Sequence, residues 1–391
     1  MEAPGRSTRR TKPPANQRRR TMQLSDFTTL QVADYRRFLM TEGNIPIPKY
    51  RQGRYIQVVV LRETKSHAIF TTEGQTLDVE VLQAGLHNTQ AIDRIVMYKR
   101  KQIAPERRTG RALSRARGFG PVEDKKDAKG KVIVPQGECE IMGNACGLCA
   151  DCILYGFAAT TGTASQKARV LTDSGFVIRS QDQVMRDIKL NAIQETTAGG
   201  IAGSAYAHRE NVLPQVFLPT AETLLDVTPP EFIYVLSNIL MTTRYGAESN
   251  REGFVRNHIL GIYFSEAEVF SNLELTQRFY DALAVSAPNA NESDPKQVPD
   301  YLAHKDFQAK WKEVAETSLK ATIGQVKRMT DEHLAALVAD TQKLYADEGS
   351  LTKFLRELHQ QAFDYATQIK GKATPSEEEN ESTEESSGEE A

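Results

Sequence analysis

The sequence predicts an α+β fold, because segments with strand character dominate its first two thirds and helical periodicity dominates its last third. The strongest strand is the β-branched, nearly continuous run Tyr55–Leu61, which is typical of a central strand buried on both faces. Residues 305–370 instead repeat apolar side chains at helical spacing. A chain of 391 residues is long enough to bury a large core.

The remaining strands are shorter and follow in chain order. We expect them at the ranges 68–72, 77–82, 92–99 and 259–264. Residues 187–217 predict a hairpin, with two arms on either side of the glycine-rich stretch 197–203.

Three helical segments complete the prediction. A buried helix begins after Thr228, which can cap it, and carries Pro229 and Pro230 in its first turn, where proline is tolerated. Amphipathic helices are expected over 266–285 and 305–370.

The two ends of the chain are strongly charged and of opposite sign. Residues 1–21 contain seven basic side chains and one acid, whereas residues 373–391 contain eight Glu and no Lys or Arg. We expect tails over 1–21 and 371–391 to be disordered. Without the acidic tail the rest of the chain, residues 1–372, is net positive, which permits a polyanionic partner. Without a membrane-spanning run or a secretory signal, and with clustered cysteines, a cytoplasmic protein with no membrane partner is expected.

All four cysteines lie within fourteen residues, in the order Cys139, Cys146, Cys149 and Cys152. Thiolate is a soft ligand, and a Cys-x2-Cys knuckle delivers two sulfurs to one tetrahedral ion such as Zn²⁺. An iron–sulfur cluster is the main alternative, and disulfides are a weaker one. Four sulfurs on one ion leave no open coordination position, so the predicted zinc is structural rather than catalytic.

The segment Lys99–Arg117 carries eight basic residues and one acid, Glu106. It shows little apolar periodicity, so we interpret it, together with the cysteine cluster, as an insertion over about 100–157. Such an insertion would need a metal to hold it together.

Several motifs resemble one known family. The run Pro229–Gly253, with its Tyr-Val-Leu-x-Asn-Ile-Leu-x-Thr-Thr-Arg-Tyr-Gly-Ala core, is similar to the backbone subunit of type I-D CRISPR effector (Cascade) complexes, a branch of the RAMP superfamily. The stretch Cys146–Ala158 resembles the zinc-containing insertion of that family. Asn191–Ile193 and Pro219–Leu224 occur in the same order. The resemblance covers about 45–270 well and the C-terminal helices more loosely.

This resemblance implies a modified RNA-recognition-motif (ferredoxin-like) core over 22–272, with lid, zinc-binding and thumb-hairpin insertions, followed by a helical region over 273–370. It implies that several copies polymerise along one CRISPR RNA, each covering six nucleotides, and that the assembly with its other subunits pairs the guide with target DNA. Because base pairing reads the sequence, the protein need only hold the backbone and shape of the RNA.

Candidate RNA contacts follow from this resemblance and from the basic residues near its motifs. They are Arg54, Arg62, Lys167, Arg169, His208, Arg209, Arg244, Tyr245, Arg251 and Arg256. Candidates for guide or target contact in the basic segment are Lys99, Lys101, Arg107, Arg108 and Arg111. Each has a plainer interpretation: Arg62 can pair with Glu63, Arg244 can stabilise a helix end, and a charge run is usually a solvated face.

The first strands lack the paired exposed aromatics on which RNA-recognition motifs stack bases. RNA is therefore expected in a basic groove formed by loops and insertions, not on the sheet. The alternatives are a nuclease and a zinc-ribbon DNA-binding regulator. A nuclease would need a catalytic constellation, and Asp173 and Asp187 are isolated carboxylates, so no enzyme is expected. A zinc-ribbon regulator would bind duplex DNA as a small oligomer.

Overall fold

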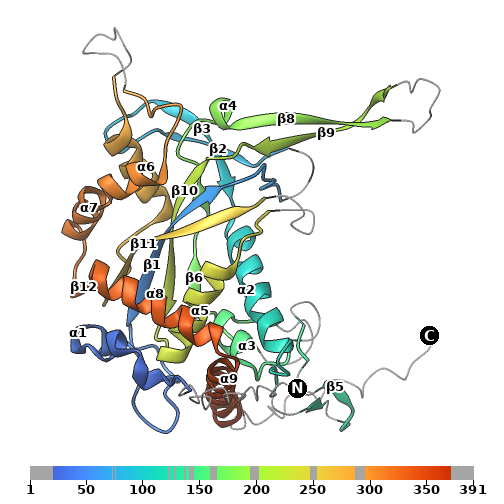
Figure 1. The fold of residues 1–391 in the computed structure, drawn as a ribbon, viewed down its shortest axis with the longest axis vertical. Coiled ribbons are helices and arrows are strands. Elements are labelled where there is room, and N and C mark those ends of the chain that lie inside the picture. Colours follow the sequence, from blue (N-terminus) through green and yellow to red (C-terminus); the bar gives the residue numbers. More distant parts are fainter. Residues whose placement is uncertain are drawn as a thin grey trace, which may run out of the picture.

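The structure is a computed structural model that describes residues 21–72, 74, 76–121, 124–126, 129–135, 138–140, 145–158, 165–193, 202–246, 253–286 and 296–370. Its centre is an antiparallel sheet of five strands in the order β12-β11-β1-β10-β6 (Figure 1). These strands are β1 (Tyr55–Thr64), β6 (Val170–Thr172), β10 (Phe217–Leu225), β11 (Val255–Ser265) and β12 (Val326–Arg328).

Both faces of this sheet are buried, as the composition of β1 predicts. Ile56, Val58 and Val60 point into one hydrophobic cluster, whereas Val59 and Leu61 point into another. This alternation follows from the two-residue period of a strand.

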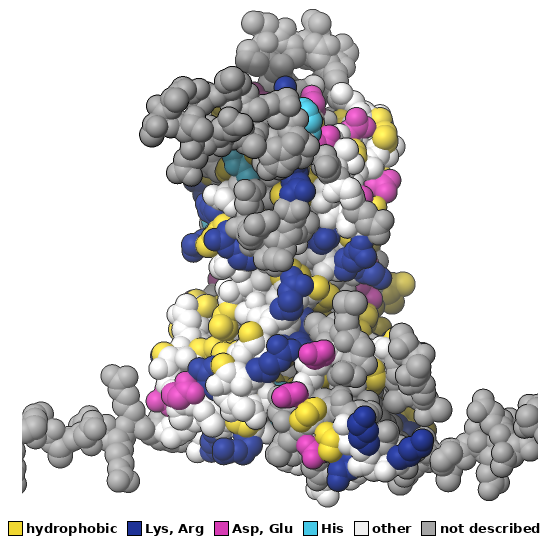
Figure 2. Space-filling view, turned by 90° about the vertical axis from the view of Figure 1, so that its right-hand side faces the viewer, with side chains coloured by type: hydrophobic (Ala, Val, Ile, Leu, Met, Phe, Trp, Pro, Cys, Tyr) yellow, Lys and Arg dark blue, Asp and Glu magenta, His cyan; other side chains and the backbone are white. Residues whose placement is uncertain are grey.

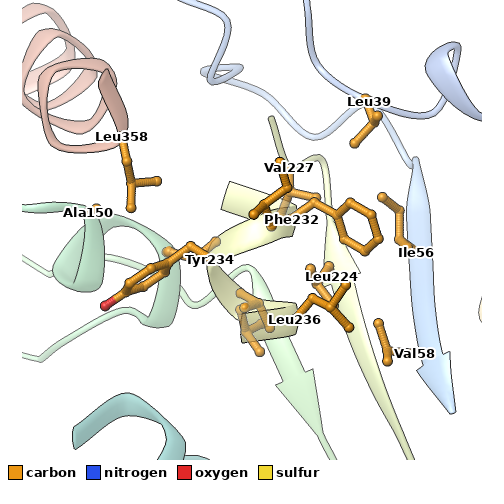
Figure 3. Packing of buried hydrophobic residues seen from close by; sticks show 14 of the residues in the cluster. Leu39, Ile56, Val58, Ala150, Leu224, Val227, Phe232, Tyr234, Leu236 and Leu358 are labelled. Carbon is orange, nitrogen blue, oxygen red and sulfur yellow. The ribbon is translucent and has the colours of Figure 1, made fainter. Parts of the chain in front are cut away.

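Helices cover the two faces. The first face is covered by α2 (Lys99–Arg115), α3 (Ala150–Tyr155), α5 (Pro229–Met241), α8 (Asp331–Ala346) and α9 (Glu348–Lys370). The second face is covered by α6 (Asn272–Leu283) and α7 (His304–Lys320). Figure 3 shows how Phe232 of α5 packs beside Ile56 of β1 and Leu224 of β10.

Smaller elements surround this core. A second sheet has the order β2-β3-β7, with β2 (Val79–Gln83), β3 (Ala91–Met97) and β7 (Gly175–Phe176). β8 (Met185–Ile193) and β9 (Ala202–Val212) form a hairpin that projects from the body (Figure 1). The remaining elements are η1 (Leu24–Asp26), η2 (Thr28–Gln31), α1 (Ala33–Arg36), β4 (Lys125–Lys126), β5 (Val132–Val134) and α4 (Gln181–Val184). Among the helices described, none combines the length and apolar composition needed to cross a bilayer.

The helix predicted after Thr228 is confirmed in detail. The Thr228 hydroxyl accepts a hydrogen bond from the Glu231 backbone at 3.4 Å, and the Glu231 carboxylate accepts one from the Thr228 backbone at 2.9 Å. This capping box satisfies two backbone donors that a helix start leaves unpaired. The mixed α+β class and the hairpin are likewise confirmed.

Two expectations need correction, and some strands were not predicted. Residues 68–72 form no strand, because only Ala68 pairs, with Val212, while Phe70 is buried through side-chain packing in a hydrophobic cluster. The basic segment is not an irregular insertion but the helix α2, which packs against α5. Strands β10 and β12 were not predicted, although β10 lies at the heart of the sheet.

The contact between α2 and α5 depends on Gly110. A Cβ atom at this position would collide with the Tyr234 hydroxyl and the Asn238 amide, both on the buried helix α5. Replacement of glycine by alanine within a helix normally stabilises it by about 1 kcal/mol. Here the sign is reversed, because two buried polar groups would have to move.

We therefore predict that Gly110→Ala lowers the free energy of unfolding by about 1–3 kcal/mol, the usual cost of overpacking. Gly349→Ala in α9 is the matched control, because its Cβ would meet only the Asp347 carboxylate at 3.6 Å. Urea unfolding checks both variants. A Gly110→Ala protein that is more stable than the wild type would contradict this account of the contact.

Candidate metal centre and nucleic-acid surface

The four cysteines converge at the start of α3, and all four are buried. The sulfur of Cys152 lies 3.5 Å from that of Cys139 and 3.9 Å from that of Cys146, and all four sulfurs lie within 4.8 Å of one another. Thiolates about 2.3 Å from a tetrahedral Zn²⁺ would lie about 3.8 Å apart. The thiols are free rather than joined in disulfides. This cage fits one ion and leaves no room for several irons with bridging sulfides.

The four sulfurs of the cage differ in acidity: the pKa values of Cys139 and Cys146 are lowered, whereas those of Cys149 and Cys152 are raised by their thiol neighbours. Hydrogen bonds from the thiols of Cys146, Cys149 and Cys152 lower the pKa of Cys139. The backbone N–H groups of Leu148 and Cys149 both donate to the Cys146 sulfur at 3.3 Å. Such donors stabilise the charged form of a ligand.

Side chains of α2 hold the cysteine segment in place. Arg111 and Arg115 both donate to the backbone carbonyl of Cys139. Arg111 and Arg107 also bind the buried carboxylate of Asp151, at 2.7 and 2.8 Å. Burial raises the pKa of Asp151, although both arginines oppose this shift. The metal cage and the basic helix are therefore one hydrogen-bonded unit.

The sequence suggested that the cysteine segment is an independent insertion, but the structure shows that it is part of the core. Ala150, Ile153, Leu154 and Tyr155 of α3 belong to the main hydrophobic cluster, together with residues of α5 and α9. The backbone of Ala150 also faces the His359 ring of α9, with the nitrogens 3.4 Å apart. The cage is thus built onto the core, because α3 supplies apolar side chains to it.

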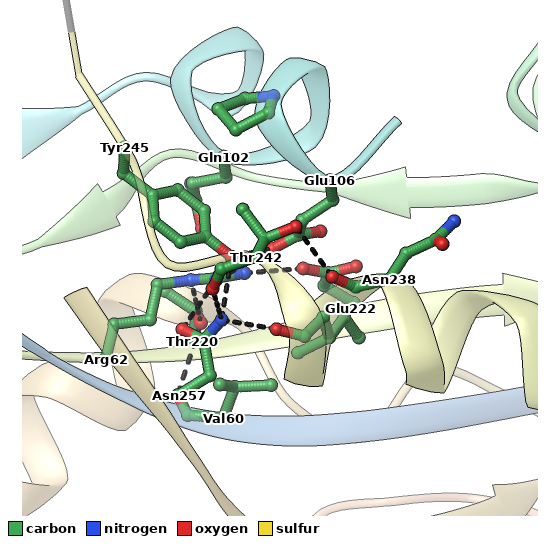
Figure 4. Close-up of polar contacts among 12 residues, drawn as sticks. Val60, Arg62, Gln102, Glu106, Thr220, Glu222, Asn238, Thr242, Tyr245 and Asn257 are labelled. Carbon is green, nitrogen blue, oxygen red and sulfur yellow. Dashed lines mark hydrogen bonds and ion pairs between the residues drawn. The ribbon is translucent and has the colours of Figure 1, made fainter. Parts of the chain in front are cut away.

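Arg62 lies at the centre of a buried polar network (Figure 4). Its guanidinium donates to Glu106 of α2 at 2.8 Å, to Glu222 of β10 at 2.5 Å and to Asn257 of β11 at 3.1 Å. Tyr245 donates its hydroxyl to the same Glu106 oxygen at 2.6 Å. The network joins three strands to one helix.

This burial corrects two predicted RNA contacts. Arg62 and Tyr245 are both 0% exposed, so no phosphate reaches them. The alternative pairing of Arg62 with Glu63 does not form either, because the two side chains point to opposite faces of β1; Glu63 instead binds Lys65 and His258. Burial, followed by the neighbouring Glu106, raises the pKa of Glu222 well above its ordinary value. This shift favours the protonated form of Glu222 beside the ion pair of Arg62 and Glu106.

Other predicted contacts are also structural. Arg169 is buried and binds both carboxylate oxygens of Glu231, which ties β6 to the start of α5. Arg111 and Arg107 serve Asp151, as described above. Arg251 lies outside the residues that the structure describes.

The remaining predicted residues lie nearer the surface. Lys99, Arg108, Lys167, His208, Arg244 and Arg256 are exposed, and Arg54, Lys101 and Arg209 are half-buried. His208 lies 3.1 Å from Asp187 across the hairpin, and Arg244 lies over the Phe254 ring at 5.5 Å. Arg54 donates to the carbonyl of Arg37.

Helix α2 presents a basic stripe to solvent. Lys101, Arg108 and Arg115 are seven residues apart, which places them on one side of the helix at intervals of about 10 Å. Figure 2 faces the side of the molecule that carries α2 in Figure 1, and Lys and Arg side chains extend along it while acids are few. Within the described residues Arg108 has no hydrogen bond or ion pair. This surface suits a polyanion.

The acids that organise these sites were not predicted from the sequence. Glu106, Glu222 and Asp151 are buried and bind the arginines that had been assigned to RNA. The structural role of Asp151 could have been predicted from the sequence, because it lies between two of the clustered cysteines, Cys149 and Cys152. The pairing of Glu222 with Arg62 has no signal in the sequence, because the two residues are 160 positions apart in the chain.

Comparisons with known proteins agree with this architecture. The profile of a family described as Csc2 Crispr matches residues 44–355. The crystal structure of Thermofilum pendens Csc2 is similar in fold, with a TM-score of 0.56 at 17% identity, covering 90% of this chain and 99% of that one. No curated protein matches the sequence.

Chains of two larger assemblies show weaker likeness. A chain of a CRISPR RNA-guided surveillance complex has a TM-score of 0.42 at 8% identity, covering 74% of this chain and 99% of that one. A chain of such a complex in a pre-nicking state has a TM-score of 0.41 at 10% identity, covering 75% and 99%. These two similarities add nothing to the fold assignment.

The cage predicts that the purified protein contains one metal ion per chain. Cys149→Ser should lose the ion and also lower the melting temperature of the whole protein, because α3 belongs to the core. Structural zinc sites contribute on the order of 10 kcal/mol, comparable to the stability of a domain. Elemental analysis and thermal melts check this. A metal-free Cys149→Ser protein that melts like the wild type would refute it.

The network predicts different effects on stability for substitutions of Arg62 and of Glu222. Arg62→Met should lower the free energy of unfolding by about 3–5 kcal/mol, because it leaves buried Glu106 without a counter-charge. Glu222→Gln should be tolerated, because glutamine resembles the protonated acid.

The raised pKa of Glu222 also means that wild-type stability falls as pH rises above 4.5, since only the unfolded chain releases this proton. Urea unfolding from about pH 5 to pH 8 should show less decline for Glu222→Gln. Equal destabilisation by both variants would mean that Glu222 is ionised.

Proposed function

The chain belongs to the Csc2 CRISPR family, and from this membership we propose that it is the CRISPR RNA-binding backbone subunit of a type I-D effector complex. Several copies would bind along one guide RNA, together with other subunits, and present the guide for pairing with target DNA. The observation that carries the proposal is the exposed basic stripe of α2 on a family member whose sheet faces are both covered.

The path of the chain supports an RNA-recognition-motif type of core. The elements β1, α2, β6, β10, α5 and β11 occur in this chain order as strand, helix, strand, strand, helix, strand, with the smaller elements inserted between them. The strands lie in the order β11-β1-β10-β6, so the fourth strand of this unit is beside the first and the second is at the edge. This is the ferredoxin-like pattern. The helices α2 and α5 both pack on one face, as that pattern requires.

The other face of such a core commonly stacks RNA bases. Here α7 covers this face, and its side chains Phe307 and Trp311 lie in one hydrophobic cluster with Leu61 and Leu260 of the sheet. RNA stacking on the sheet would require α7 to leave. Binding along the outer side of α2, toward the β8–β9 hairpin, requires no such change. We therefore propose that this side carries the guide, with Arg108, Lys99 and Lys101 as phosphate contacts and Arg244 and Arg256 as further candidates.

The metal is proposed to be Zn²⁺ with a structural role. Four thiolates would complete its coordination, so it would supply no open position for chemistry. Its ligands would hold the Cys139 carbonyl where Arg111 and Arg115 bind it, and so fix the orientation of α2. We further propose that the chain holds RNA rather than cleaving it. Asp187, one isolated carboxylate, is engaged by His208.

The direct test of the proposal is whether the purified protein carries RNA and migrates as large, nuclease-sensitive assemblies. Large assemblies that collapse on RNase treatment would support the backbone role. A small oligomer that prefers duplex DNA would instead indicate a regulator.

Arg108 provides the residue-level prediction. Arg108→Ala should weaken binding to single-stranded RNA about tenfold and reduce the slope of log affinity against log salt by about one, because one phosphate contact is lost. The melting temperature should not change, because this side chain has no partner within the described residues. Arg108→Lys should retain most of the affinity.

Lys312→Ala on α7 is the matched control, since Lys312 is 88% exposed and lies on the other side of the sheet. Fluorescence anisotropy over roughly 50–200 mM salt measures all variants. Equal affinities for Arg108→Ala and Lys312→Ala would show that α2 does not contact RNA.

A further inference from the structure

A second basic surface lies at the opposite end of the sheet from the hairpin, where β1 begins (Figure 1). It is formed by residues 36–54, which we call the entry loop. Its cations are Arg36, Arg37, Lys49, Arg51 and Arg54. Glu42 is the one acid within this loop, and nearby Asp34 pairs with Lys327 at 3.4 Å. The loop is therefore strongly positive.

The entry loop lines an open pocket of about 450 Å³ that combines charge with apolar walls. Arg36, Arg37 and Arg54 line it together with one acid, Glu42, and with apolar side chains that include Leu39, Met40 and Pro46. Cavities of a few hundred Å³ accept small organic groups. Apolar walls suit the faces of a nucleobase, and arginine suits phosphate.

An exposed aromatic ring stands beside this cavity. Tyr50 is 71% exposed, and the Lys49 ammonium lies 5.4 Å from its ring centroid. The neighbouring residues Pro48 and Gln52 both line the cavity. An exposed tyrosine among cations is the arrangement on which proteins stack bases of single strands.

The loop is held in place by a buried acid. The Asp226 carboxylate accepts hydrogen bonds from the backbone nitrogens of Gln52 at 2.8 Å and Arg54 at 2.9 Å. Asp226 is 1% exposed and adopts a φ of 51°, which residues other than glycine rarely do. The surrounding structure therefore fixes the end of the entry loop, so the cavity is present before any ligand binds.

We propose that the entry loop is a second binding subsite for single-stranded nucleic acid, in which a base stacks on Tyr50 and Arg36, Arg37 and Arg54 hold the adjoining nucleotide. The inference rests on the proposed RNA-binding function and adds a contact at the end of the sheet remote from the hairpin. The ligand class follows from the combination of exposed ring, arginines and apolar walls. An acidic protein would require the cations but not the exposed ring.

The test uses the full chain and a single-stranded polyuridine RNA that carries one fluorescent 2-aminopurine. Tyr50→Ala should weaken binding about tenfold, within the range measured for one base stacked on an aromatic ring, and should relieve quenching of the probe. Tyr50→Phe should behave as the wild type, because stacking needs the ring and not the hydroxyl. Arg36→Ala should weaken binding and lower the salt dependence.

Tyr301→Ala is the matched control, because Tyr301 is 89% exposed but follows Asp300 and lies outside the entry loop. Normal binding by Tyr50→Ala would overturn the inference. If Tyr50→Ala binds RNA normally but fails to assemble with other subunits, the surface binds protein and the inference is also wrong. Loss of affinity in Arg108→Ala alone would defeat this subsite and leave the proposed function standing, whereas a wild-type protein without RNA affinity would defeat the function itself.

Discussion

The buried guanidinium of Arg62 is the interaction on which the arrangement of the core depends. It contacts β10, β11 and α2 from the middle strand, so four elements that are far apart in the sequence meet at one cation. An arginine without exposure is tolerated only when its donors are satisfied and its charge is balanced. Glu106 balances the charge, and Glu222, whose raised pKa favours its protonated form, supplies a further acceptor.

This network determines what α2 presents to solvent. Glu106 faces inward to Arg62, and Gly110 allows α5 to approach closely, so Lys101 and Arg108 must face outward. Near its C-terminal end, Arg111 and Arg115 bind the Cys139 carbonyl. The helix is therefore fixed at two places, once by an ion pair in the core and once by the cysteine cage. A metal bound by the four cysteines would therefore fix the position of the basic surface without contacting the nucleic acid that we propose binds there.

The sequence predicted those parts of the fold that are determined by residues close together in the chain. The β-branched run of β1, the capped start of α5 and the spacing of the cysteines each carry their own physical cause, and each was predicted from the chain. Helix α2 was not predicted, because its inner side is polar: Gln102, Glu106 and Arg111 are buried through hydrogen bonds rather than apolar contacts. The assignment of Arg62 and Arg169 to RNA failed for a related reason. Their partners Glu222 and Glu231 lie 160 and 62 residues away, and nothing in the sequence marks them as partners.

The central claim is that RNA follows the outer side of α2 and not the face of the sheet. Ultraviolet crosslinking of the protein to bound single-stranded RNA, followed by mass spectrometry of the crosslinked peptides, tests this directly. The account predicts crosslinks in peptides from α2 and the β8–β9 hairpin, and none at Phe307 or Trp311, which are buried against the sheet. Crosslinks at Trp311 or on the strand residues beneath it would mean that α7 opens and that RNA occupies the sheet, which would contradict the account.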